Sequence, residues 1–189
     1  MNLPNKLTIL RLIMIPAFVA VFYITAIPYG LVIAAAIFAL AAATDFLDGY
    51  IARKYNLVTN LGKFLDPIAD KVLVAAALII MLVKPVGGVE ILPSYGAIAV
   101  AIILARELIV SGFRMVAATK GAVLAADWSG KIKTFVTDIA ILMLLIVAEF
   151  APMYSIANIV GLALLGVATI LTLYSGIECV VKNRAVLKD

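Results

Sequence analysis

Six long apolar segments limit what this chain can fold into. Each is close to the length that an α-helix needs to cross about 30 Å of hydrocarbon. Their residues lack the strict alternation of a membrane β-barrel, so we expect helices, which satisfy their own backbone hydrogen bonds. The sequence therefore predicts an all-α integral membrane protein with six transmembrane helices. The segments cover residues 7–27, 29–48, 64–83, 95–116, 133–149 and 156–181.

The composition excludes a water-soluble domain. Of the 189 residues, 66% are hydrophobic and 14% are charged, whereas soluble domains are about half apolar and a quarter charged. No linker or low-complexity stretch divides the chain, so residues 1–189 are predicted to form one domain. Histidine is absent, which removes imidazole as a general base and as a zinc ligand, and the single Cys179 excludes an internal disulfide.

The basic residues predict how the chain lies in the membrane. Of the 15 Lys and Arg residues, all but Lys84 lie in or beside the N-terminus, the 49–63 and 114–133 connections and the C-terminal tail, or within the fourth segment. Cytoplasmic segments of membrane proteins are enriched in Lys and Arg. We therefore expect a multi-pass protein of the cytoplasmic membrane with both termini in the cytoplasm.

Two pairs of acids interrupt the apolar pattern. Asp45 and Asp48 close the second segment, and Asp66 and Asp70 open the third. Charged groups near lipid cost several kcal/mol unless they are paired, bind metal or line water. Residues three or four apart share a helix face, and the short connection makes the two helices antiparallel neighbours. The four carboxylates are therefore predicted to converge near the cytoplasmic surface.

This acidic group is suited to metal-assisted phosphoryl transfer. Oxygen ligands without His or Cys favour Mg²⁺ or Mn²⁺, and two such ions about 4 Å apart stabilise the attacking and leaving oxygens. The residues between the acid pairs fit a diphosphate. Gly49 and Ala52 leave room on the helix, Arg53 supplies a guanidinium, and Gly62 permits a tight turn into the third segment.

A different interpretation treats the acids as ion-pair partners only. Cations are near in the sequence, but simple pairing leaves the glycine and alanine positions unexplained. A prenyltransferase would need a second Asp-rich motif, and an ion carrier would place its acids near the middle of the bilayer. The cations that could pair with the acids are Arg53, Lys54, Lys63 and Lys71.

The complete spacing reads D-x2-D-G-x2-A-R-x8-G-x3-D-x3-D from Asp45 to Asp70. It resembles the signature of the CDP-alcohol phosphatidyltransferase family, and every fixed position is present. The resemblance implies that a CDP-activated lipid or alcohol loses CMP while its phosphatidyl group passes to a hydroxyl. It also implies that Asp45, Asp48, Asp66 and Asp70 hold two divalent cations, Mg²⁺ or Mn²⁺, and that Asp70 is the general base.

Segments outside this signature resemble the bacterial phosphatidylglycerolphosphate synthases of the family. They are residues 2–11, 106–107, 111–114 and 126–134. The resemblance implies a homodimer that joins CDP-diacylglycerol to glycerol 3-phosphate, an enzyme of anionic phospholipid biosynthesis. A sister enzyme that uses inositol phosphate, serine or phosphatidylglycerol is the alternative. The residues implied to bind CDP-diacylglycerol are Asn5, Thr8, Arg11, Gly49, Ala52, Arg53 and Gly62.

Glycerol 3-phosphate is a dianion, so its pocket needs cations close to the acids. Arg106, Arg114, Lys131 and Lys133 lie toward the cytoplasmic side of the fourth and fifth segments and are the predicted ligands. Alternatively, the lysines contact anionic headgroups and the arginines pair with Glu107.

Three further polar residues have open alternatives. Asn5 can instead cap a helix, and Arg11 can extend toward the interface. Asp138, a lone acid in the fifth segment, can support the metal site or pair with a cation.

Overall fold

The computed structural model describes residues 2–24, 26–55, 59–85, 90–119, 128–150 and 156–184. Within these ranges the regular structure is entirely helical, which confirms the all-α prediction. The helices are α1 (Leu3–Tyr23), α2 (Gly30–Lys54), α3 (Asn60–Val83), α4 (Gly96–Thr119), α5 (Trp128–Phe150) and α6 (Ile156–Lys182).

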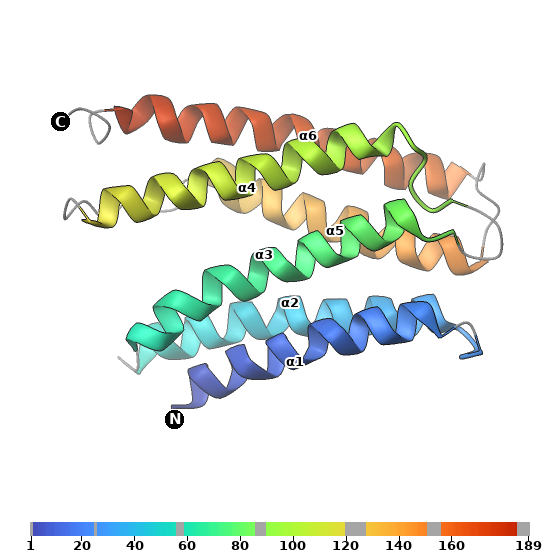
Figure 1. Cartoon of the computed structure of the whole chain (residues 1–189), viewed down its shortest axis with the longest axis horizontal. Coiled ribbons are helices and arrows are strands. Elements are labelled where there is room, and N and C mark those ends of the chain that lie inside the picture. Colours follow the sequence, from blue (N-terminus) through green and yellow to red (C-terminus); the bar gives the residue numbers. More distant parts are fainter. Residues whose placement is uncertain are drawn as a thin grey trace.

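Successive helices run in opposite directions along one bundle (Figure 1). Both ends of the chain lie on the left in that view, together with the ends of α2 and α4 and the starts of α3 and α5. We call this side of the bundle the basic end, because it gathers the segments in which Lys and Arg are concentrated. Helix α1 packs mainly on α2, α5 packs mainly on α6, and contacts of α2 with α5 and of α1 with α3 connect the bundle.

Four of the six helices that the structure describes, α1, α2, α4 and α6, are long and apolar enough to cross a membrane. The chain is thus a membrane protein by length and composition, while six membrane spans and cytoplasmic termini stay predictions. Helices α3 and α5 carry more charge, and most of that charge belongs to the site described below. Their charged residues in the apolar part are Asp66, Asp70 and Lys71 in α3 and Lys133, Asp138 and Glu149 in α5.

The helices extend further at the basic end than the apolar segments suggested. Helix α2 continues to Lys54 and α3 begins at Asn60, so the predicted 49–63 connection is much shorter. Hydropathy marks only the apolar part of a helix, whereas backbone hydrogen bonding continues through polar residues. Both acid pairs consequently lie inside their helices rather than at the helix ends.

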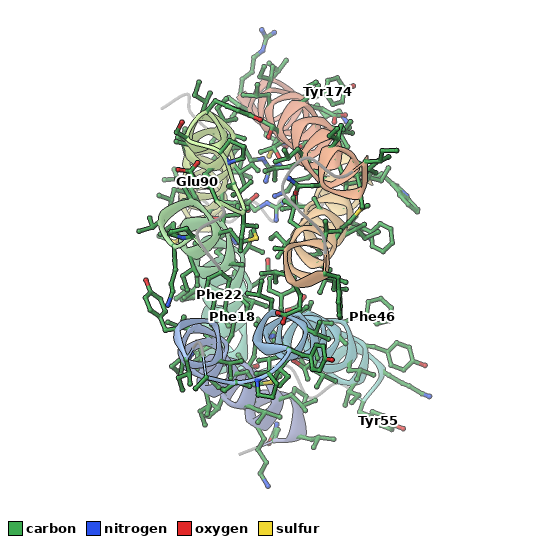
Figure 2. The ribbon with its side chains drawn as sticks, turned by 90° about the vertical axis from the view of Figure 1, so that its right-hand side faces the viewer. Phe18, Phe22, Phe46, Tyr55, Glu90 and Tyr174 are labelled. Carbon is green, nitrogen blue, oxygen red and sulfur yellow. The ribbon has the colours of Figure 1, made fainter. Side chains whose placement is uncertain are left out.

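The interior of the bundle is built from aromatic and small side chains. The Phe18 ring packs against Phe22 and Phe38, with both pairs of ring centroids 6.2 Å apart. Figure 2, which looks along the helices, shows Phe18 and Phe22 on the inner side and Phe46 and Tyr174 directed outward. These outward rings are more than half exposed, as expected for residues that face lipid.

A glycine sets the distance between α5 and α6. A Cβ added at Gly161 would lie 2.9 Å from Leu144 Cδ2 and 3.1 Å from its Cγ. Small residues allow membrane helices to approach closely, and dispersion contacts then stabilise the pair.

Replacing this glycine is expected to destabilise the bundle. Gly161→Val should lower the free energy of unfolding by about 1–3 kcal/mol, because the added side chain overlaps the fully buried Leu144 side chain of α5. Thermal unfolding of the purified protein in detergent measures the change. Gly166→Val is the matched control, since Gly166 has nothing within 4 Å of its added Cβ. Equal melting temperatures for the two variants would contradict this packing.

Candidate active site

The acids of α2 are paired with a buried arginine from α1. The Arg11 side chain has 0% exposure, and its Nη1 and Nη2 donate to Asp45 Oδ1 at 2.7 Å and Asp48 Oδ2 at 2.5 Å. Its Nε donates to the Ala41 carbonyl oxygen at 3.2 Å. A buried charge is tolerated only when it is paired and hydrogen-bonded. One guanidinium therefore pairs with both carboxylates of α2 and leaves one negative charge in excess.

The same face of α1 also reaches an acid of α3. Thr8 lies one helical turn before Arg11, and its Oγ1 donates to Asp66 Oδ1 at 2.6 Å. Three of the four predicted metal ligands thus contact α1, both acids of the first pair and one of the second. Sequence reasoning treated Thr8 and Arg11 as nucleotide contacts and did not foresee these bonds, although their spacing of three residues was a signal of a shared face.

The start of α3 lies tightly against α1. Thr59 caps α3 by accepting from the Gly62 N–H at 3.0 Å, and its own hydroxyl donates to Asn5 Oδ1 at 2.8 Å. A Cβ added at Gly62 would lie 3.1 Å from Asn5 Oδ1. Gly62 is therefore inside the first turn of α3, where it allows a close approach rather than forming the turn itself.

The contacts of Asn5 and of several of the cations are known where their side chains are described. Arg11 is buried and does not extend toward the interface, and Asn5 bonds to Thr59 rather than capping a helix. Lys71 Nζ donates to the Pro67 carbonyl oxygen, and Lys54 Nζ lies over two tyrosine rings. The side chains of Arg53 and Lys63 lie outside the described residues.

Gly49 and Ala52 lie in the last two turns of α2, where both are half-buried. They follow Asp48 directly on the part of the helix that extends toward the basic end. This is the position that the sequence predicted for small residues beside a diphosphate.

The carboxylates match a hard divalent cation in their chemistry. Their hydrogen bonds with α1 use Oδ1 of Asp45, Oδ2 of Asp48 and Oδ1 of Asp66, so the second oxygen of each lies outside these bonds. Among the described residues, no three acids are close enough together to form a complete metal site. The donor set fits Mg²⁺ or Mn²⁺.

A second polar group surrounds a pocket between α3, α4 and α5. The pocket holds about 290 Å³ of empty space, part of it open to the outside. Asp70 belongs to its wall, so this residue connects the acid signature with the pocket. The lining residues are Asp70, Lys71, Val74, Ile103, Glu107, Lys133, Thr134, Thr137 and Asp138.

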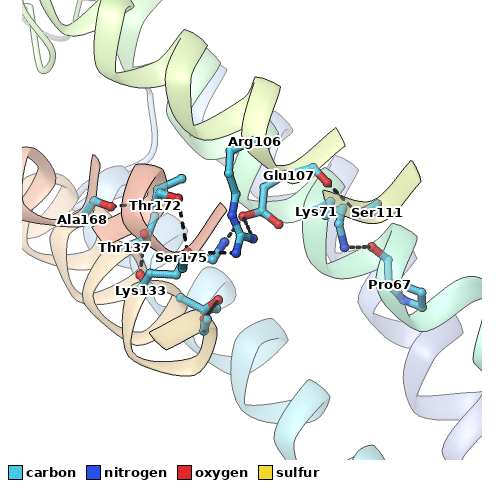
Figure 3. A network of polar contacts seen from close by, with 12 residues as sticks. Pro67, Lys71, Arg106, Glu107, Ser111, Lys133, Thr137, Ala168, Thr172 and Ser175 are labelled. Carbon is cyan, nitrogen blue, oxygen red and sulfur yellow. Dashed lines mark hydrogen bonds and ion pairs between the residues drawn. The ribbon is translucent and has the colours of Figure 1, made fainter. Parts of the chain in front are cut away.

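Glu107, which lines this pocket, is also the centre of a network of polar contacts (Figure 3). Its Oε1 pairs with Lys133 Nζ and accepts from Arg106 Nη1 at 3.3 Å. Arg106 Nη2 donates to Ser175 Oγ at 2.9 Å, so α4, α5 and α6 are joined through polar side chains. A Cβ added at Gly176 would lie 2.9 Å from Arg106 Cγ, which explains the glycine beside this arginine.

The four residues predicted to bind glycerol 3-phosphate lie in different surroundings. Lys133 lines the pocket, and Arg106 lies beside it through Glu107. Lys131 is exposed, with Nζ 5.8 Å from the Trp128 ring centroid. The Nε atoms of Arg106 and Arg114 are buried and have no hydrogen-bond partner among the described residues.

Sequence reasoning missed part of the pocket wall. Lys71 was considered only as a partner of the acids, and the threonines Thr134 and Thr137 were not considered. Asp138, whose role was open, lines the pocket together with Lys133. The i,i+4 spacing from Thr134 to Asp138 was the signal that these residues share a face.

Removing the carboxylate of Glu107 is expected to destabilise the protein. Glu107→Gln leaves Lys133 and Arg106 buried without their counter-charge, a change that costs about 3 kcal/mol or more. Thermal unfolding should show a lower melting temperature. Glu178→Gln, which removes the partly exposed ion pair with Lys182, is the control and should change the melting temperature much less. Similar melting temperatures for both variants would contradict the role of Glu107.

Comparison with known proteins shows the family of the chain. The sequence model of the CDP-alcohol phosphatidyltransferase family matches residues 1–174. A Bacillus subtilis protein named CDP-diacylglycerol–glycerol-3-phosphate 3-phosphatidyltransferase is 40% identical, over 99% of this chain and 97% of its own length. Proteins of the same name from Rickettsia bellii and Escherichia coli K12 are 41% and 40% identical, over 93% and 100% of this chain and 91% and 98% of their own lengths. The chain belongs to the CDP-alcohol phosphatidyltransferase family.

Proposed function

We propose that this enzyme transfers the phosphatidyl group of CDP-diacylglycerol to sn-glycerol 3-phosphate, giving phosphatidylglycerol phosphate and CMP for anionic phospholipid biosynthesis. The relatives named for this reaction match almost the whole chain. The observation that carries the proposal is the position of Asp70, which belongs to the acid signature and also lines a pocket that contains Lys133 and Lys71. This position of Asp70 supports a diphosphate site beside an anion site.

Asp45, Asp48, Asp66 and Asp70 would hold two divalent cations, Mg²⁺ or Mn²⁺. When bound, such ions neutralise diphosphate charge and stabilise the attacking and leaving oxygens. The oxygen-only donor set and the second oxygens of the carboxylates, which face no hydrogen bond from α1, support this assignment.

Asp70 would act as the general base. Its carboxylate takes the proton of the glycerol 1-hydroxyl as that oxygen attacks the phosphorus that carries diacylglycerol. The new phosphorus–oxygen bond forms as the bond to the CMP oxygen breaks, and CMP leaves. The pocket wall beside Asp70 supports this role, because an acceptor bound there has its hydroxyl next to the base.

The cations around the pocket would bind the phosphate of the acceptor. Lys133 is the foremost candidate since it lines the pocket, and Arg106 is the second because it shares Glu107 with Lys133. Arg114 and Lys131 remain in the proposed set, and neither lines the pocket.

The CDP-diacylglycerol would lie on the other side of the acids. Gly49, Ala52 and Gly62 leave room beside the carboxylates, and Arg53 contributes a cation. On α1, the residues beside the acids are Asn5, Thr8 and Arg11. Their contacts with α3 and with the acids support a role in shaping the site.

The enzyme would work in the cytoplasmic membrane as a homodimer of single-domain subunits, with its termini and active site on the cytoplasmic side. The concentration of Lys and Arg at the basic end supports this orientation. The lipid tails would then stay in the bilayer while glycerol 3-phosphate and CMP exchange with the cytoplasm.

Asp70→Asn is expected to reduce kcat by about 10²- to 10⁴-fold, because a general base contributes this much. CMP release by purified protein with CDP-diacylglycerol, glycerol 3-phosphate and Mg²⁺ measures it. Glu90→Gln, a change at an exposed residue shortly before the start of α4 and so away from the basic end, is the control. Inositol phosphate, serine and phosphatidylglycerol are tested as acceptors alongside, and turnover of one of these instead of glycerol 3-phosphate would refute the proposed reaction.

Lys133→Met is expected to raise the KM for glycerol 3-phosphate by about tenfold or more, since it removes a charge-assisted contact worth about 1.5–3 kcal/mol. The KM for CDP-diacylglycerol should change little. Lys131→Met should have a smaller effect, and Lys182→Met, an exposed change on α6, should have none. A rise in the KM for CDP-diacylglycerol alone would assign Lys133 to the other substrate.

A further inference from the structure

We propose that Thr8 and Arg11 are positioning residues, which orient Asp45, Asp48 and Asp66 so that the second oxygen of each carboxylate is presented to a divalent cation. This inference rests on the proposed ligation of metal by these acids and assigns a new task to α1. The two residues would act through the carboxylates and not by contact with the substrate.

The geometry of Arg11 suits two carboxylates that lie one helical turn apart. Its Nη1 and Nη2 each donate to a different carboxylate of α2, and Nε donates to the backbone of the same helix one turn earlier. The donors of the planar guanidinium form a rigid fork. The three hydrogen bonds therefore hold Arg11 in one orientation, and that orientation in turn holds both carboxylates. A lysine has a single ammonium and cannot hold this arrangement.

Thr8 performs the corresponding task for α3 without a charge. Its hydroxyl donates to Asp66 Oδ1 at 2.6 Å, and the side chain is 1% exposed. The contact depends on the close approach of α1 and α3, which Gly62 allows. One face of α1 therefore orients acids from two different helices, whose relative position would otherwise be set only by apolar packing.

The burial of Asp48 makes its orientation by Arg11 important. Asp48 is 2% exposed, so water screens little of its repulsion with the neighbouring acid, and Arg11 supplies the compensating charge. Hydrogen bonds to ligand carboxylates generally fix their direction, and losing one costs about 10–100-fold in metal affinity. If Arg11 merely competed with the cation for the acids, its removal would instead raise that affinity. The two ideas therefore predict effects of opposite sign.

Binding of Mn²⁺ without substrate tests the inference. The signal of free Mn²⁺ in electron paramagnetic resonance is titrated with purified full-length protein in detergent. Arg11→Gln and Thr8→Val should each weaken Mn²⁺ binding by about tenfold or more. Thr8→Ser keeps the hydroxyl and should bind as the wild type does, whereas Arg11→Lys should restore only part of the loss. Thr169→Val, which removes a buried hydroxyl that donates within α6, should leave the affinity unchanged.

The outcomes separate this inference from the metal site itself. Asp48→Asn removes a proposed ligand, so a wild type that binds Mn²⁺ no better than this variant overturns the metal site and the inference together. If the wild type binds more tightly than Asp48→Asn but Arg11→Gln and Thr8→Val bind as well as the wild type or better, only the inference is overturned. Should Arg11→Gln fail to fold, the nearly isosteric Thr8→Val decides the test. Weaker Mn²⁺ binding by Thr8→Val, with wild-type binding by Thr8→Ser, supports the positioning role. Unchanged Mn²⁺ binding by Thr8→Val refutes it.

Discussion

The ion pairs of Arg11 with Asp45 and Asp48 are the interaction on which the arrangement of the site depends. They place a guanidinium with 0% side-chain exposure between helices α1 and α2, beside Asp48, which is 2% exposed, and Asp45, which is 43% exposed. Such a group is stable only when its members stay together. The register of α1 against α2 is therefore set by electrostatics at the basic end, while the phenylalanine packing further along the two helices contributes apolar contact.

The bundle separates two kinds of polar surroundings. Among the described side chains, three acids contact α1 and one guanidinium pairs with two of them, which suits divalent metal. Between α4, α5 and α6 the contacts of Glu107 hold Arg106 and Lys133 in place. Helix α3 lies between these regions and carries Asp70. Both substrates of the proposed reaction are anions and need positive charge, which metal held by the acids would supply to the diphosphate and Lys133 would supply to the acceptor phosphate.

Sequence reasoning succeeded where a local pattern has only one physical outcome. The apolar segments had to become helices, and the spacing from Asp45 to Asp70 placed acids on adjacent helices near the basic end. It was incomplete where partners are distant in sequence. Nothing local shows that Arg11 bonds to residues 34 and 37 positions away, or that Gly62 admits Asn5. The polar extensions of α2 and α3 were missed because hydropathy does not detect a helix that continues into water.

The sequence by itself determined the all-helical membrane character, the alternation of the helices and the acid signature, because membrane thickness and helix periodicity act on neighbouring residues. Only the tertiary structure decided which cation meets the acids, which lysines line the pocket and why Gly62 and Gly176 are small. Those outcomes depend on the distances between α1, α2 and α3 and between α4, α5 and α6. Helix packing sets these distances, and it involves residues that no short segment of the chain contains together.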